Sequence, residues 1–370
     1  MNELARGRLA MKYIVFELLP IFLLGMTIFI LVLIMFQSFQ LSEYVIIHGA
    51  KFSATLQLIF FTALGFLPIL LPIALMFAVL LTYGRMSGDS EIVAFKALGL
   101  GQFHLLLPAL VLGALISVLS LQVSFRLAPW GNLQLNNLIG KLMQTRPAVS
   151  IREGVFSEGA FDLVIYASKV NSSEGILKKV FIFDERDQAS PLTIIAKEGE
   201  LVTHATDVGQ EALLRLFSGS VHKSAKEFYT KIDFGTYDIS LFDPNQNKER
   251  KSGPESMDMS ELHEAMKHLD PKDNESINFI LEWHRRWALS ATCLILALVG
   301  FGLGTVTNRR AARSGSMVIC ISTLVIYWAV YVGFESLIRS GKMPASIGAW
   351  MTNIIFLGFG IYQFRRSREN

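Results

Sequence analysis

The stretch at 85–99, between two long apolar stretches, carries the side chains best placed for chemistry. Asp89 can cap a short helix that begins at Ser90 and covers 90–98, and Gly99 can end that helix. Glu91, Phe95 and Leu98 have the spacings i, i+4 and i+7 and therefore share one helix face. This face is apolar except for one acid, which lies near the positive end of the helix dipole. Such a helix suits docking into a groove on another protein. The alternative is a helix lying on lipid, which would usually carry more Lys and Arg.

Two further patterns resemble chemical motifs but lack the necessary geometry. His263 and His268 differ from the zinc-protease pattern, because a spacing of five places the second ring about 140° away on a helix. A G-x-G-x-G run follows no strand and therefore favours close helix packing over nucleotide binding; it consists of Gly300, Gly302 and Gly304. The sequence contains no G-x-x-x-x-G-K-[ST] motif. We therefore expect no catalytic site, metal or cofactor, and any ATP would be hydrolysed by another chain.

One acid lies at the start of an apolar stretch. Glu17 follows Lys12 and Tyr13 by about one helical turn. An acid inside a membrane span is a functional hypothesis by default. Here a carboxylate that reaches the membrane surface is favoured over a proton relay, because the spans contain no chain of acids.

The composition indicates which elements position these residues. The chain has 370 residues, of which 52% are apolar and 18% charged, whereas a soluble domain has about 25% charged residues. A spanning helix needs about 20 apolar residues. Six stretches free of Asp, Glu, Lys and Arg meet or approach that length, and they are 18–36, 52–84, 97–125, 287–308, 314–334 and 343–364. The sequence therefore predicts six membrane spans.

The formal net charge of +3 combines two regions of opposite sign. Residues 131–282 hold 17 Lys and Arg against 24 Asp and Glu, a net of −7, and the remainder holds 17 against 7, a net of +10. Eleven basic residues flank the spans on one side and six on the other, which places both termini in the cytoplasm and the polar region outside. An aromatic belt at the outer boundary would consist of Trp130, Trp283, Trp287 and Trp350.

The polar region has the pattern of a β domain. Short alternating or β-branched runs occur at 154–169, 180–183, 192–196, 213–217, 228–234 and 237–241. Gly199 and Gly219 are among the turn signals expected between them. This spacing predicts a sandwich or jelly roll without disulfides, since the region contains no Cys. A polar tether at 249–275, with a short helix near 259–267, would join the domain to the fourth span.

Several short motifs occur in a specific order along the chain. They are Leu67-Pro68 with Pro72, Arg85 with Asp89-Ser90-Glu91 and Gly99, Arg146-Pro147-Ala148, Gly154-Val155-Phe156, Asp184-Glu185-Arg186-Asp187, Gly341, Pro344, Ala349-Trp350 and Asn353. In these motifs the chain resembles the lipopolysaccharide-export permeases of the LptF/LptG (YjgP/YjgQ) family over essentially its whole length, and the 184–187 stretch favours the F-type subunit.

The resemblance and the spans together predict a membrane α-helical fold of six transmembrane helices (3+3) with an inserted periplasmic all-β, jelly-roll-like domain. Spans one to three and the coupling helix would occupy 1–128. The β domain and its tether would occupy 129–275, and spans four to six would occupy 276–370.

The resemblance also implies partners. Two permeases, one of each type, would pair with a cytoplasmic ATPase dimer in the bacterial inner membrane, extract lipopolysaccharide and pass it to a periplasmic bridge of similar jelly rolls. No nucleic acid is expected. Span one of one subunit and span five of the other would form lateral gates. Glu91 would match the family's coupling-helix acid, which contacts the ATPase, and Asp89, Phe95 and Leu98 lie beside it in the sequence.

The candidate substrate contacts depart from the family pattern. Family members often carry Lys or Arg in the outer half of span one, where this chain has Gln37 and Gln40. Amides do not neutralise phosphate, so either the partner subunit supplies the charge or the lipid is less anionic. Three basic residues near the outer boundary are candidates to compensate, namely Arg126, Arg286 and Arg339. For Arg339 an ion pair with Glu335, one turn earlier, is favoured over substrate contact.

Two other functional interpretations remain open. A membrane-anchored periplasmic receptor or assembly scaffold without transport activity would use the β domain to bind a protein, although six spans exceed what an anchor needs. An intramembrane hydrolase is less favoured, because the sequence offers no convincing nucleophile–base or metal pair.

Overall fold

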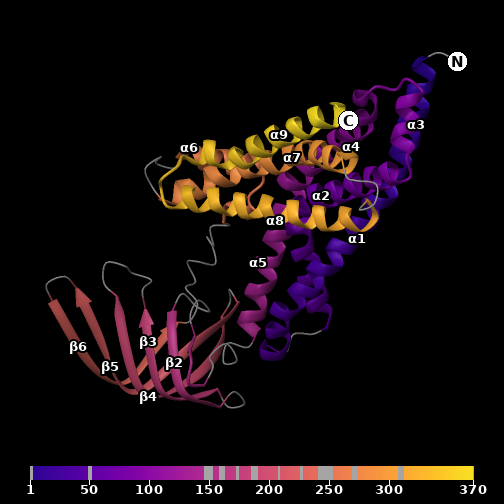
Figure 1. The fold of residues 1–370 in the computed structure, drawn as a ribbon. Coiled ribbons are helices and arrows are strands. Elements are labelled where there is room, and N and C mark those ends of the chain that lie inside the picture. The colour runs from indigo at the N-terminus through magenta and orange to yellow at the C-terminus, as the bar shows by residue number, and fades with distance from the viewer. Residues whose placement is uncertain are drawn as a thin grey trace. The chain divides into compact units, whose positions relative to one another are not determined.

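The computed structural model describes most of the chain (Figure 1). The described residues are 3–48, 52–145, 153–157, 163–171, 175–184, 191–206, 209–225, 228–240, 253–268, 274–306 and 312–369. They form two compact units. The first comprises Met1–Gln37, Ile59–Gln134 and Gly253–Asn370, and the second comprises Ser38–Leu58 and Leu135–Ser252.

Six helices are long and apolar enough to cross a membrane, as predicted. The first two are α1 (Glu3–His48) and α2 (Phe52–Gly88), and the last three are α7 (Asn274–Val306), α8 (Ala312–Arg339) and α9 (Ala345–Glu369). The third consists of α4 (Gln102–Gln122), a π-helical turn (Val123–Leu127) and α5 (Ala128–Thr145) in unbroken succession. Because a π-bulge widens a helix without ending it, this helix continues well past the expected third apolar stretch.

Apolar side chains of α1, α2, α4 and α7 form the main core of the first unit. Three glycines of α7 permit close contact with neighbouring helices. A Cβ on Gly300 would lie 3.2 Å from Val79 of α2, one on Gly302 2.7 Å from Gln363 of α9, and one on Gly304 2.9 Å from Tyr83 of α2. The predicted role of this G-x-G-x-G run in helix packing is therefore confirmed.

The spanning helices differ in how much of their apolar surface the chain itself covers. In α7, 72% of the most apolar stretch is buried, but the corresponding share is 17% in α1 and 22% in α8. The buried side chains of α1 lie in its first half, for example Ile14, Leu18 and Phe22. Among the described side chains from Met26 to Ser38, none is buried. Among the described side chains, α1 is therefore buried in its first half and only partly covered from Met26 to Ser38.

The described strands form one antiparallel sheet whose order follows the sequence. They are β1 (Phe156–Ser157), β2 (Leu163–Asn171), β3 (Ile176–Asp184), β4 (Leu192–Thr206), β5 (Gly209–Ala225) and β6 (Phe228–Ser240). The all-β prediction is confirmed, and the runs at 228–234 and 237–241 belong to one strand except for Leu241, which lies outside the described residues.

A crease crosses this sheet from β2 to β6. On one side, a row of cross-strand neighbours faces the core and consists of Ala167, Val180, Ala196, Gly219 and Phe234. The next inward-facing row consists of Val170, Leu177, Gly199, Leu216 and Tyr237. In every strand the members of the two rows are three residues apart. In a regularly alternating strand, residues that face the same side are separated by an even number of positions.

Two residues at the crease, Lys179 and Ser218, have positive φ values of 49° and 53°. The switch in alternation allows apolar side chains from both sides of the crease to enter one core, with Ile182 and Leu214 fully buried. The sheet is drawn strongly curved in Figure 1.

The expectation that Gly199 and Gly219 mark turns is wrong, because both lie inside strands. A Cβ on Gly219 would clash with the carbonyl oxygen of Ile195 and would lie 2.6 Å from the ring of Phe234. Glycine is therefore needed for close approach of strands and side chains next to the crease.

Candidate functional site

The short helix α3 (Glu91–Ala97) lies where the sequence predicted a docking helix. Its C-terminal end is as expected: Gly99 has a φ of 84°, its N–H donates to Lys96 O, and the Leu100 N–H donates to Phe95 O. This pair of bonds is a Schellman motif, which glycine favours. The expected Asp89 cap is wrong. The N-cap is Ser90, with a φ of 61° and no side-chain cap bond.

Asp89 instead lies near Arg85, the basic residue in the last turn of α2. Its N–H donates to Arg85 O at 2.8 Å, and its Oδ2 lies 3.8 Å from Arg85 Nη1. Because α2 continues to Gly88, Asp89 belongs to the turn between two helices and its carboxylate faces a guanidinium.

Arg85 brings three carboxylates together. Its Nη2 lies 2.9 Å from Glu17 Oε2 of α1, and its Nη1 lies 3.4 Å from Glu91 Oε1 of α3. With Asp89, these groups form what we call the acidic cluster, consisting of Glu17, Arg85, Asp89 and Glu91. Three acids around one base leave the acidic cluster with a formal charge of −2, which favours an approaching cation.

Tyr13 adds a direct link between α1 and α3. Its hydroxyl donates to Glu91 Oε2 at 3.1 Å, and its ring centroid lies 6.2 Å from that of Phe95. The pairing of Glu17 with Arg85 and the contact of Tyr13 with Glu91 were not predicted from the sequence. The spacing of Tyr13 and Glu17 at i and i+4 was the available signal, because it places both on one face of α1.

A groove of about 560 Å³ lies beside the acidic cluster. It is lined by Leu9, Ala10, Tyr13, Glu91, Ala94, Phe95, Leu98 and Leu100. The structure therefore brings Glu91, Phe95 and Leu98 onto one surface. This groove offers an apolar floor with a carboxylate, and so fits an apolar side chain of a partner next to a cationic one.

A second polar site involves the segment that leads into α7. We call this segment, Gly253–His268, the collar. It contains a 3₁₀ turn (Pro254–Ser256) and the predicted helix α6 (Met259–His268). Asp258 caps α6: its Oδ1 accepts bonds from the N–H groups of Ser260 and Glu261, both at 2.8 Å, while Glu261 Oε2 accepts the Asp258 N–H. These bonds lower the pKa of the Asp258 carboxyl below its ordinary value, the Glu261 N–H contributing most.

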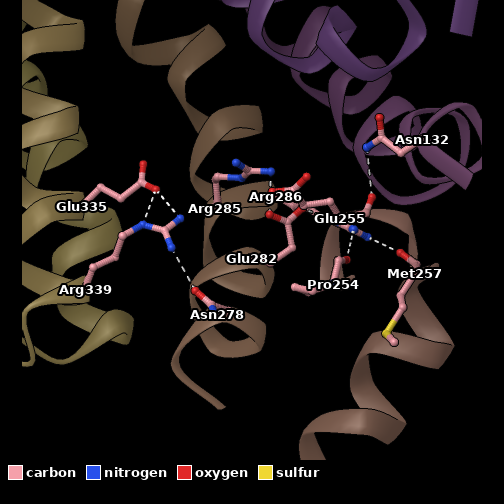
Figure 2. Close-up of polar contacts among 10 residues, drawn as sticks. All are labelled: Asn132, Pro254, Glu255, Met257, Asn278, Glu282, Arg285, Arg286, Glu335 and Arg339. Atoms are coloured by element: carbon pink, nitrogen blue, oxygen red, sulfur yellow. Dashed lines mark hydrogen bonds and ion pairs between the residues drawn. The ribbon is translucent and has the colours of Figure 1, made fainter. Parts of the chain in front are cut away.

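Arg286 attaches the collar to α7 (Figure 2). Its Nη1 donates to Met257 O and its Nη2 to Pro254 O, both at 2.8 Å, while its Nε donates to Glu282 Oε1 at 2.8 Å. Only 3% of the residue is exposed, and its guanidinium lies 5.5 Å from the centroid of the Phe125 ring. These intramolecular contacts support a structural role rather than substrate contact.

The neighbouring Arg285 has a more open environment. Its Nη2 lies 2.6 Å from Glu282 Oε2, and its side chain is 30% exposed. Its buried Nε has no hydrogen-bond partner among the residues that the structure describes. Arg285 was not predicted as a candidate from the sequence, because two adjacent arginines cannot be distinguished without knowing which one faces the collar.

The other candidate contacts are dispersed. Arg339 Nη2 lies 2.7 Å from Glu335 Oε1, so the predicted ion pair is confirmed, and its Nη1 donates to Asn278 (Figure 2). Arg126 is exposed in the π-helical turn, and Gln37 is half-buried on α1. Gln40 also belongs to α1, but its side chain lies outside the described set.

Six spanning helices, an inserted β sheet and a short interhelical helix beside an open groove define a multi-span membrane protein with an inserted β domain. The pattern of the family described as "Lipopolysaccharide export system permease LptF/LptG" matches residues 12–366. The chain therefore belongs to the LptF/LptG family of lipopolysaccharide export permeases, which are transmembrane subunits.

Curated relatives agree with this membership. The chain is 23% identical over 302 residues to the lipopolysaccharide export system permease protein LptF of Escherichia coli (strain K12), covering 79% of this chain and 77% of the relative. The LptF protein of Shigella flexneri matches at the same identity and coverage. An uncharacterized protein of Rickettsia prowazekii (strain Madrid E) is 23% identical over 299 residues, covering 78% of this chain and 80% of the relative.

Proposed function

We propose that this permease is the F-type subunit of an exporter that extracts lipopolysaccharide from the bacterial inner membrane, driven by a separate cytoplasmic ATPase. The observation that carries the proposal is the groove between α1 and α3, with Glu91 on its wall. The names of the LptF relatives support the choice of subunit type.

Docking of the ATPase would use both parts of this surface. A partner's apolar side chain would enter between Phe95 and Leu98, and a partner's Lys or Arg would approach Glu91 and Asp89. Leu98 is 60% exposed in the isolated chain and is available to be covered. The formal charge of −2 on the acidic cluster would draw in the cation.

A second permease would cover other surfaces of the chain. The low burial of α1 and α8 supports these helices as the ones that face the partner subunit and form the gates. Lipopolysaccharide would pass between the two subunits, with Gln37, Gln40, Arg126 and the Arg285–Glu282 pair as candidate contacts. Arg286 and Arg339 are weaker candidates, since each is held by partners within the chain.

The β domain would receive the lipid and pass it to a periplasmic bridge protein. Its folded sheet encloses an apolar interior suited to acyl chains. Buried side chains such as Ile182 and Leu214 occupy this interior, so passage of a lipid would require the two sides of the crease to separate.

The test of docking is Glu91→Lys, with Lys96→Gln as a control on the same helix that does not line the groove. We expect the lysine variant to lose co-purification of the ATPase and export of lipopolysaccharide, because it places like charge against a cationic partner. The control should retain both. Normal co-purification and full export by Glu91→Lys would overturn the proposal.

The proposed orientation places both termini in the cytoplasm and the β domain in the periplasm. Cys293 and Cys320 are buried, so a single added cysteine can report topology. A membrane-impermeant maleimide applied to intact spheroplasts should label Thr236→Cys in β6 and should label Lys12→Cys only after lysis. The reverse pattern would contradict the orientation.

A further inference from the structure

The attachment of α1 is concentrated at one end of the helix. Ile14, Leu18 and Phe22 pack into the core, whereas the described side chains beyond Gly25 have no buried member. A helix that is buried around 14–22 and only partly covered over its described side chains from 26 to 38 can tilt about the buried part. The contacts near Tyr13 and Glu17 are therefore well placed to control its direction.

The acidic cluster joins this held part of α1 to α3 through one side chain. Arg85 contacts Glu17 at 2.9 Å with one terminal nitrogen and Glu91 at 3.4 Å with the other. A guanidinium is planar and rigid, so its two ends cannot move independently. Displacement of Glu91 therefore changes the position of the nitrogen that Glu17 contacts.

We propose that Arg85 is a positioning residue that carries movement of α3 to α1, by holding Glu91 and Glu17 on the two ends of one guanidinium. The proposal rests on the proposed docking of an ATPase at α3 and deepens it. A partner's cation that binds Glu91 would move this carboxylate together with α3. Arg85, which holds Glu91 Oε1 with Nη1 and Glu17 Oε2 with Nη2, moves with it, and the held end of α1 changes its orientation.

The solvent exposure of Arg85 and Glu17 limits how much their ion pair can contribute to folding stability. The side chains of Arg85 and Glu17 are each 35% exposed, and ion pairs as accessible as this add little to folding stability. Their effect is geometric, so removal of either charge should leave the protein folded and alter the transmission of movement. If the pair were purely structural, removal of either charge would destabilise the fold and leave the transmission of movement unchanged.

The experiment uses the complete complex in proteoliposomes containing lipopolysaccharide, and measures lipopolysaccharide exported per ATP hydrolysed. Glu17→Gln and Arg85→Gln should each lower this ratio about tenfold, within the usual range of coupling between sites. The double variant should be no worse than the poorer single variant, because either change already breaks the link. Lys12→Gln, an exposed charge on the same helix outside the acidic cluster, is the control and should retain the wild-type ratio.

Two results would overturn the proposal: an unchanged ratio in Glu17→Gln, or effects of the two variants that multiply. Its failure is distinguishable from failure of docking, since Glu17→Gln should still co-purify the ATPase whereas Glu91→Lys should not. If the wild-type complex exports no lipopolysaccharide, amide hydrogen exchange tests the proposed link instead. Arg85→Gln should then speed amide exchange in 7–17 and 91–97 together, and unchanged exchange in either segment would refute the link.

Discussion

Asn353 of α9 accepts a hydrogen bond from the hydroxyl of Tyr327 of α8 at 3.1 Å. Its amide nitrogen donates to Ala288 O of α7 at 2.8 Å, and Thr292 Oγ1 of α7 lies 3.0 Å from its Oδ1. All these groups are buried, so one side-chain amide joins three spanning helices through polar contacts.

Replacing this amide should loosen the attachment of α8. Asn353→Leu would remove one hydrogen bond each from the Ala288 carbonyl and the Tyr327 hydroxyl, both of which also contact Thr292 Oγ1, at an expected cost of about 1–3 kcal/mol in unfolding free energy. Thermal denaturation in detergent measures this loss of stability. Thr352→Val is the matched control, since the Thr352 hydroxyl is buried and has no hydrogen-bond partner in the described part of the chain. Equal destabilisation by both variants would contradict the prediction.

Arg286 should matter for stability far more than Arg126. Arg286→Met removes the donor to Pro254 O and Met257 O and one partner of Glu282, and should cost about 3–5 kcal/mol. Limited proteolysis should then cut the collar. Arg126→Met changes an exposed side chain and should shift stability by less than about 0.5 kcal/mol. A protected collar in the Arg286 variant would show that other contacts hold it.

The cap of α6 should make the collar sensitive to acid. The folded state lowers the pKa of Asp258, so the cap contributes fully above the ordinary carboxyl pKa of about 4 and is lost as pH falls through the folded-state value. Hydrogen exchange of 259–268 as a function of pH measures this loss.

Two variants separate the Asp258 charge from its geometry. Asp258→Ala should cost about 1 kcal/mol near neutral pH. Asp258→Asn retains a capping oxygen but does not titrate, so it should remove the acid sensitivity without removing the cap. Persistence of the acid transition in the Asn variant would assign it to another group.

Two glycines near the crease should differ in how well they tolerate a side chain. Gly219→Ala would force a clash with Ile195 O and the Phe234 ring, and should destabilise the sheet by about 1–3 kcal/mol. A Cβ on Gly235 meets no atom of the described residues within 4 Å, so Gly235→Ala should be nearly neutral. Unfolding of the full-length protein, monitored by hydrogen exchange in β4 and β5, compares the two. A tolerated Gly219→Ala would mean that the strands move apart easily.

The sequence predicted what depends on local pattern. Six apolar stretches, the runs of β residues and the Gly99 stop signal each have a short-range physical cause, and each is found in the structure. The pairing of Arg339 with Glu335 is likewise fixed by the spacing of one helical turn.

What the sequence did not predict depends on contacts between distant residues. Glu17 and Arg85 are far apart in the chain, and only the packing of α1 against α2 brings them together. Arg285 and Arg286 are adjacent and chemically alike, and only the position of the collar distinguishes them. The helical extension beyond Phe125 was missed because its sequence is less apolar than that of α4, and the helix continues through a π-helical turn into α5.

The crease also determines which changes of length the β domain tolerates. The apolar pattern before the crease is out of phase by one residue with the pattern after it, in all five strands from β2 to β6. Inserting or deleting one residue within a single strand would turn half of that strand inside out, exposing residues such as Val180 or Leu216 to water. Relatives that keep this core must therefore place odd-numbered insertions in the connections between strands, or shift all five strands together.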